Sequence, residues 1–214
     1  AATQRQGNLV QPDTNGWMTM YEHLFSIWVL LIFPLFVTLE AALLAQLEYG
    51  NHTWKLAYSQ PAPRWAVVAA KQIWSLGLVA LGMLALIGLT VVGGAILKII
   101  LPELDMQASI PWDEMFRQAG ITFLAAGTIL ALHTWIALRS GSFVIASAIG
   151  IGMTIAGLVL GGLEWTEFFP WSMPATTLHQ YYEGGAIARY LAVGFISWLV
   201  LSLLGNWDVK RLEI

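Results

Sequence analysis

Two ionisable residues stand inside long apolar stretches, where an uncompensated charge is energetically expensive. Glu40 lies within LFSIWVLLIFPLFVTLEAALLAQ (24–46), and His133 lies within an apolar run at 121–138. An acid at the centre of a bilayer costs about 2.5–3.5 kcal/mol on insertion scales, so such a group is expected to face the interior of a protein bundle. A carboxylate and an imidazole from two helices could form a proton or substrate site, or a purely structural hydrogen bond. Both residues are therefore candidate pathway residues.

Other residue types give no indication of catalysis or of cofactor binding. Cysteine is absent, which excludes disulfides, thiolate chemistry and cysteine-ligated metals. The four histidines do not have the spacing of an HExxH zinc site, and the phosphate-binding motif GxxxxGK[ST] is absent. We therefore expect no catalytic residue, cofactor or metal ion in this chain. The net charge of -3 does not indicate a nucleic-acid partner.

The composition is that of a membrane protein. Hydrophobic residues make up 57% of the chain and charged residues only 11%, against about 25% charged residues in soluble domains. A spanning helix needs about 20 predominantly apolar residues. Five stretches approach or exceed that length, and together they predict an all-α, polytopic integral membrane bundle that forms a single transmembrane domain over 1–214: 24–46, 73–97, 121–138, 143–163 and 188–204.

The basic residues of the links predict the orientation of the bundle. Six lie on one side: Lys55, Arg64, Lys71, Arg139, Lys210 and Arg211. Four lie on the other side: Arg5, Lys98, Arg117 and Arg189. The positive-inside rule places the first side in the cytoplasm, together with the C-terminus. Five spans then put residue 1 outside, and this polar start without a signal peptide leads us to expect a further spanning helix before Ala1.

The predicted external linker, 164–187, is rich in aromatic residues and prolines. Its first half carries Trp165, Phe168, Phe169, Pro170, Trp171 and Pro174. The prolines prevent a continuous helix, and the aromatic density favours a segment that dips into the membrane interface. An aromatic belt explains these residues, and so does an external gate built from short helices. Phe168, Phe169 and Trp171 are the candidates for such a gate.

The predicted cytoplasmic linker, 47–72, contains a short amphipathic segment, NHTWKLAYS (51–59). Asn51 can cap a helix, and Pro61 and Pro63 would end it. Such a helix at the membrane surface could dock on a soluble partner. An ordinary interfacial loop is the alternative, because amphipathic turns are common at membrane surfaces.

The order and spacing of several linker residues resemble one family, the type-2 permeases of ABC transporters. In its first cytoplasmic segment, an acid that ends one helix is followed by a Thr-Trp-Lys-Leu turn, a proline, an arginine and a lysine. The matching residues here are Glu48, Thr53, Trp54, Lys55, Leu56, Pro61, Arg64 and Lys71. The segment FFPWSMP (168–174) and the closing WDVKRLEI (207–214) resemble the same family, most closely its bacteriocin-immunity and bacitracin-resistance permeases.

The resemblance implies six spans, a coupling helix at residues 51–59 and short external helices before the last span. The residues that it assigns to ATPase coupling are Glu48, Thr53, Trp54, Lys55, Leu56 and Tyr58. It further implies a permease subunit, not itself an enzyme, that exports an amphipathic peptide, antibiotic or lipid across the bacterial cytoplasmic membrane. ATP and Mg would bind to a separate cytoplasmic ATPase, and a second copy or a related permease would complete the pathway.

Two alternatives remain at this point. The chain could be an accessory or structural transmembrane subunit of a larger membrane complex. It could also be an intramembrane enzyme, which would need Glu40 and His133 within hydrogen-bond reach of each other in a cavity.

Overall fold

The computed structural model describes residues 15–50, 64–101, 106, 108–161, 163 and 167–211. Within these residues the structure is helical, with no strand, which confirms the predicted all-α membrane bundle. The helices are α1 Gly16–Ile27, the π-helical turn η1 Trp28–Ile32, α2 Phe33–Gly50, α4 Arg64–Ile100, α5 Trp112–Ala125, α6 Gly127–Ser140, α7 Phe143–Leu160, α8 Met173–Tyr182 and α9 Ala188–Arg211.

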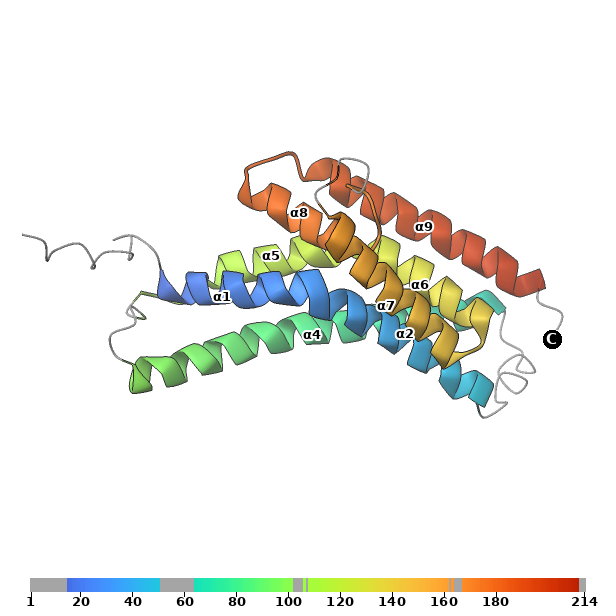
Figure 1. The fold of residues 1–214 in the computed structure, drawn as a ribbon, viewed down its shortest axis with the longest axis horizontal. Helices are drawn as coiled ribbons and strands as arrows, with labels where there is room; N and C mark the ends of the chain where they lie inside the picture. The colour runs from blue at the N-terminus through green and yellow to red at the C-terminus, as the bar shows by residue number, and fades with distance from the viewer. Residues whose placement is uncertain are drawn as a thin grey trace, which may run out of the picture.

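The long helices run back and forth between the two ends of an elongated bundle (Figure 1). Four helices of the described chain are long and apolar enough to cross a membrane: Gly16–Leu47, Val68–Ile100, Phe143–Leu160 and Ala188–Asp208. The pair α5 and α6, bent by 45°, adds a fifth if it is counted as one broken span. The ends of α2, α6 and α9 therefore lie at one end of the bundle, with the starts of α4 and α7. The starts of α1 and α5 lie toward the other end, with the end of α4, and α9 begins nearer the middle of the long axis.

The first long helix contains a π-helical turn because a proline interrupts it. Pro34 has no N–H to donate to the carbonyl of Leu30, and its ring would clash with that carbonyl in a regular α-helix. The chain widens just before this point, and the Phe33 N–H bonds to the Trp28 carbonyl five residues earlier. The helix is capped by Asn15, whose side chain accepts a hydrogen bond of 3.0 Å from the Trp17 N–H.

Every fourth residue of this helix is buried, from Trp17 to Ala45. The buried series is Trp17, Tyr21, Phe25, Val29, Phe33, Val37, Ala41 and Ala45. Residues four apart in an α-helix are offset by about 40°, so a stripe of this period winds around the helix. The winding lets α1 pack against α4, while α2 packs against α6 and α7.

The bend between α5 and α6 lies where α9 crosses them most closely. A Cβ added at Gly127 would lie 2.9 Å from the carbonyl oxygen of Gly194. Small residues at such crossings let two helix backbones approach within contact distance. Gly127 and Gly194 therefore allow α6 and α9 to pack closely. This pairing is the most extensive contact between two helices in the described structure.

Candidate functional site

His133 lies at the point where three helices meet inside the bundle. It is fully buried on α6, and the backbone of Thr38 on α2 is its polar neighbour. A Cβ added at Gly150 on α7 would lie 2.9 Å from the His133 ring and 2.6 Å from the Thr38 methyl group. Neither ring nitrogen has a hydrogen-bond partner of normal geometry among the described residues. The imidazole is thus a buried polar group with unused hydrogen-bonding capacity.

Trp171 covers the His133 ring from the linker before α8. The two ring centres are 5.9 Å apart, and the rings meet edge to face. Trp171 is only 2% exposed, and it also packs against Phe169, at 5.7 Å between ring centres. A residue of the predicted external linker therefore reaches a candidate pathway residue in the interior. The sequence indicated both residues but not their contact.

Phe168 packs against α9, whereas Trp171 packs against α6. The Phe168 ring packs against Tyr190 of α9, at 5.5 Å between centres, and the Arg189 guanidinium lies 5.8 Å from its centre. Phe168 is exposed, whereas Phe169 rests on α7 at Gly157. The three aromatic candidates thus connect α6, α7 and α9 through one linker. Whether they act as a gate stays a prediction.

Glu40 lies on a different face of α2 from Thr38, the residue that contacts His133. Residues two apart on an α-helix are separated by about 200°, so Thr38 and Glu40 point to opposite sides. Glu40 is 8% exposed, and the Ser75 hydroxyl on α4 is the polar group that interacts with it. Its carboxyl oxygens make no hydrogen bond of normal geometry within the described structure.

No hydrogen bond or ion pair joins Glu40 to His133 in the described part of the chain. The intramembrane enzyme of the sequence analysis required the two side chains to act together, and this arrangement gives it no support. Leu44 lies one helical turn after Glu40 on α2. Its carbonyl accepts a hydrogen bond of 2.9 Å from the buried Lys71 ammonium of α4. The α2–α4 contact therefore carries its own polar groups, apart from those around His133.

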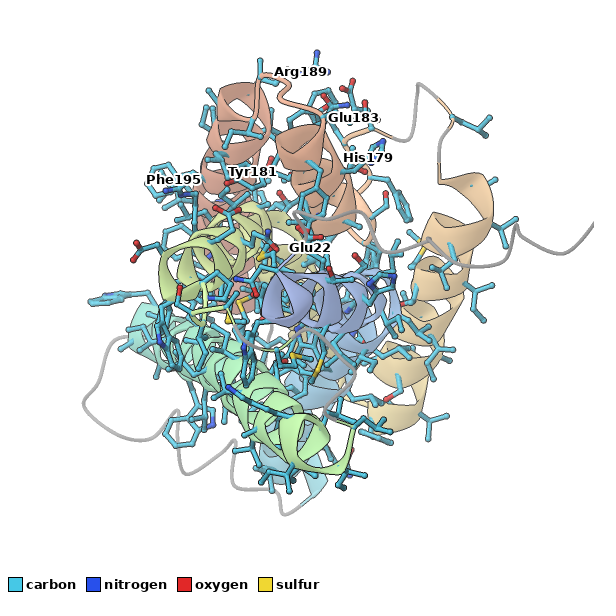
Figure 2. All side chains as sticks on the ribbon, turned by 90° about the vertical axis from the view of Figure 1, so that its left-hand side faces the viewer. Glu22, His179, Tyr181, Glu183, Arg189 and Phe195 are labelled. Carbon is cyan, nitrogen blue, oxygen red and sulfur yellow. The ribbon has the colours of Figure 1, made fainter. Side chains whose placement is uncertain are left out.

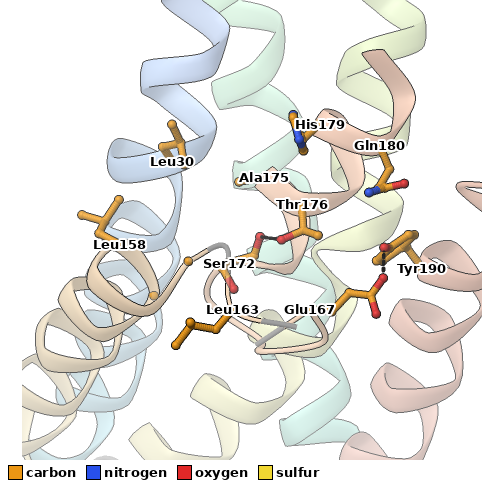
Figure 3. Close-up of a pocket in the computed structure, with 12 residues that line it drawn as sticks. Leu30, Leu158, Leu163, Glu167, Ser172, Ala175, Thr176, His179, Gln180 and Tyr190 are labelled. Carbon is orange, nitrogen blue, oxygen red and sulfur yellow. Dashed lines mark hydrogen bonds between the residues drawn. The ribbon is translucent and has the colours of Figure 1, made fainter. Parts of the chain in front are cut away.

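A groove with a volume of about 670 Å³ opens between η1, the end of α7 and helix α8 (Figure 3). Leu30, Leu158 and Leu163 form its apolar side, and the linker and α8 supply the polar side. At one edge, Arg189 and the Tyr190 hydroxyl both bond to the same carboxylate oxygen of Glu167. A cavity of this size and mixed lining is suited to a small organic ligand.

Helix α8 is held to α5 by a network of polar side chains. The Tyr181 hydroxyl donates to the Glu114 carboxylate at 2.7 Å, and the Tyr182 hydroxyl donates to the Gln118 amide oxygen at 2.8 Å. The Gln118 amide in turn donates to Glu114 at 3.1 Å. Partial burial and the negative charge of Glu22 raise the pKa of Tyr182 well above its usual range, so its hydroxyl remains a donor.

The sequence analysis did not single out this network, although a signal for it exists. Glu114 and Gln118 are one turn apart, and a helix that begins at Trp112 puts them on one face. The apolar run predicted at 121–138 starts later, because these polar residues lower the local hydropathy. In the end-on view of Figure 2, Tyr181 lies between the levels of Arg189 and Glu22.

The residues assigned to ATPase coupling cannot be placed in this structure. Thr53, Trp54, Lys55, Leu56 and Tyr58 lie outside the described residues, as does Trp165 of the external linker. The backbone at Glu48 belongs to the last turn of α2, but its side chain is outside the described set. Their role in coupling stays a prediction.

One comparison with known proteins finds a match. A family model described as "ABC-2 family transporter protein" matches residues 5–161. No curated protein and no solved structure matches the chain.

Proposed function

Because the chain belongs to the ABC-2 family of transporter permeases, we propose that it is the membrane-spanning subunit of an ATP-driven exporter of an amphipathic peptide, antibiotic or lipid. The family match carries this proposal, since it covers about three quarters of the sequence. The family is one of integral membrane transport subunits, which pair with a cytoplasmic ABC ATPase. The finer statements that follow, on orientation, coupling and cargo, are part of the proposal.

The end of the bundle at which α2 ends and α4 begins would face the cytoplasm of a bacterial cell. The helices that flank the first link, α2 and α4, both reach this end, and so does the last turn of α9 (Figure 1). Arg139 lies here and pairs with Asp208 at 3.7 Å. A surface helix at residues 51–59 would dock on the ATPase, which would supply ATP and Mg. Residue 1 would lie outside.

Coupling would act through the helices that flank the docking segment. When the ATPase closes on ATP, it would displace the ends of α2 and α4 together, a rigid-body motion of packed helices. The displacement of α2 would reach the contact of Thr38 with Gly150 and His133. Trp171 extends that contact to the external linker. A displacement of α2 and α4 at the cytoplasmic end would thus shift the residues around the groove between η1, α7 and α8.

The membrane pathway would be completed by a second copy of the chain or by a related permease. Glu40 and His133 would contribute polar groups along the pathway, since intramembrane ionisable residues usually serve such routes.

The docking segment gives the decisive test of this proposal. The double variant Trp54→Ala, Lys55→Glu removes an aromatic anchor and reverses a charge within 51–59, and it should abolish most co-purification of the ATPase. The matched control, Trp207→Ala, Lys210→Glu, changes the same residue types near the end of α9 and should leave co-purification unchanged. An unchanged amount of ATPase bound to the first variant would contradict the coupling role.

A further inference from the structure

A second groove, with a volume of about 440 Å³, lies between α6, α7 and α9 at the end of the bundle where α6 and α9 end. Helix α6 forms its floor, since α6 packs against both α7 and α9. Three aliphatic side chains form part of its lining: Leu132, Ile136 and Ile149. Ile149 is 39% exposed, so the groove opens on the outer surface of the bundle.

The aliphatic and the charged parts of this groove lie at different depths along α6. Leu132 lies two helical turns before Arg139, about 10 Å along the helix axis. Arg139 is in the last turn of α6, and Asp208 is the last residue of the apolar stretch Ala188–Asp208. Charged side chains at the ends of spanning helices reach the level of the lipid head groups. The aliphatic part is then at the depth of the acyl chains.

The charged part of the groove holds a cation and an anion side by side. The Arg139 Nε lies 3.7 Å from the Asp208 Oδ2, and the Trp135 indole N–H donates to the same oxygen at 3.0 Å. Trp135 in turn rests against α9, since a Cβ added at Gly205 would lie 3.4 Å from its ring. The carboxylate is therefore held in place through Oδ2.

Both charged side chains keep hydrogen-bonding capacity beyond this contact. The guanidinium faces Asp208 through Nε, so its two terminal nitrogens still have N–H groups to donate, and the Asp208 Oδ1 can still accept. The side chains of Arg139 and Asp208 are 58% and 24% exposed, so both can be reached. The Ser140 hydroxyl, the remaining polar side chain of the lining, directs its proton to the carbonyls of Ala137 and Ser142 at 3.1 and 3.4 Å.

We propose that this groove binds a bilayer phospholipid with an ethanolamine head group, its phosphate at Arg139 and its ammonium at Asp208. The planar guanidinium matches two phosphate oxygens, and a primary ammonium brings three N–H donors for the carboxylate. The ethanolamine head joins phosphate and amine through a short linker, so one head group meets both side chains. One acyl chain lies along Leu132, Ile136 and Ile149.

The arginine–aspartate pair makes the groove selective among phospholipids. The pair has no net charge, which suits a zwitterionic head group. A choline head is also zwitterionic, but its quaternary ammonium has no N–H to donate to Asp208. A glycerol head has no cation, so its phosphate meets the carboxylate without compensation. This inference goes beyond the proposed permease function and does not depend on the cargo.

Three photoreactive phospholipids that differ only in the head group test the proposal. Their heads are ethanolamine, choline and glycerol, and one acyl chain of each carries a diazirine. Each is added in the same small proportion to the purified full chain in phosphatidylcholine nanodiscs, and labelled peptides are mapped by mass spectrometry. The ethanolamine probe should label the peptides with Ile136 and Ile149 about three- to tenfold more than either other probe, the equivalent of one hydrogen bond.

Variants of the two charged residues test their separate roles. Asp208→Asn keeps an acceptor for the Trp135 N–H but removes the charge, and it should abolish the preference for ethanolamine over choline. Arg139→Gln removes the guanidinium and should lower labelling by all three probes. The matched control is Arg117→Gln, which changes an arginine of similar exposure, 60%, near the start of α5. It should leave labelling of these peptides unchanged.

A bulky residue in the groove separates specific binding from general lipid contact. Ile149→Trp fills the groove and should remove most labelling of the peptide with Ile136. Ile155→Trp changes the same residue type on the same helix, at a position that is 54% exposed and outside the groove lining, and should not. Melting temperatures show which variants are folded, and the comparison of head groups on the unaltered chain needs no variant.

Equal labelling of the unaltered chain by the three probes would overturn the proposal. Stronger labelling by the glycerol probe would overturn it as well, because Arg139 would then act as a simple site for anionic lipid. So would an ethanolamine preference that survives Asp208→Asn. None of these measurements involves the ATPase, so their failure leaves the permease proposal standing, and unchanged co-purification in the docking variant leaves the lipid site standing.

Discussion

Replacing Gly150 by alanine should separate helices that the structure brings into close contact. The new Cβ would lie 2.6 Å from the Thr38 methyl group on α2 and 2.9 Å from the His133 ring on α6, and closer still to the Thr38 Cβ. Carbon atoms normally approach to about 3.5–4.0 Å. Side-chain rotation cannot relieve a clash with a Cβ atom, so α7 must shift by about the missing 1 Å.

The expected cost follows from two opposing effects. Overpacking of a well-packed interior costs about 1–3 kcal/mol, and the upper end applies here because two neighbouring helices are displaced. Alanine is better than glycine in a helix by about 1 kcal/mol. Gly150→Ala should therefore lower the free energy of unfolding by about 2 kcal/mol, which corresponds to a fall in Tm of about 4–8 °C for a chain of this size.

A neighbouring glycine on the same helix provides the control. A Cβ added at Gly152 meets nothing within 4 Å among the described residues. Gly152→Ala therefore keeps only the gain in helix propensity, and its Tm should rise by about 2–4 °C. Both variants are measured by thermal unfolding in nanodiscs. Equal melting temperatures for the two variants would refute the close approach of α7 to α2.

The swapped double variant Thr38→Gly, Gly150→Ala tests the contact itself. Glycine at position 38 removes the Cβ and the methyl group that the new alanine would meet. The two substitutions should then be less destabilising together than the sum of their separate effects, by about 1–2 kcal/mol, as expected for residues in direct contact. Additive effects would mean that the two positions do not touch.

Four further variants test other parts of the bundle. Glu114→Ala removes the acceptor of the Tyr181 hydroxyl and should lower stability by about 1–3 kcal/mol; Tyr181→Phe should reproduce part of this loss in Tm, and no change in either would refute the network. Asp208→Ala removes the pair with Arg139 and the acceptor of the Trp135 indole N–H at 3.0 Å, and it should lower stability by about 1–2 kcal/mol; an unchanged Tm would contradict these contacts. Pro34→Ala restores an N–H donor for the Leu30 carbonyl, and it should raise Tm; an unchanged or lower Tm would contradict the view that the proline interrupts the hydrogen bonding of this helix.

The class of fold could be predicted from composition, but the lengths of the helices could not. An apolar window ends where charged residues begin, whereas a helix continues as long as its backbone is hydrogen-bonded. The polar residues Glu22, Glu114 and Lys71 all lie inside observed helices and outside the predicted apolar runs. Glu114 lies in the first turn of α5, and the Lys71 ammonium donates to the Leu44 carbonyl, so neither side chain interrupts its helix.

The candidate site was predicted in part. Glu40 and His133 could be singled out because an ionisable residue is conspicuous in an apolar run. Their separation could not be predicted, because it depends on how α2 is rotated against α4, α6 and α7. The contact of Trp171 with His133 joins residues from distant parts of the sequence, and no local pattern specifies such a pairing.

The length of α4 has a consequence for the membrane around it. Its apolar stretch Val68–Ile100 has 33 residues and is about 50 Å long at 1.5 Å per residue, whereas the hydrocarbon core of a bilayer measures about 30 Å. The helix must therefore cross at a steep tilt or extend beyond the core. Because a helix that is too long responds to a thicker bilayer by standing more upright, lipid chain length becomes a variable that sets the angle of α4 and of the α1 segment packed on it.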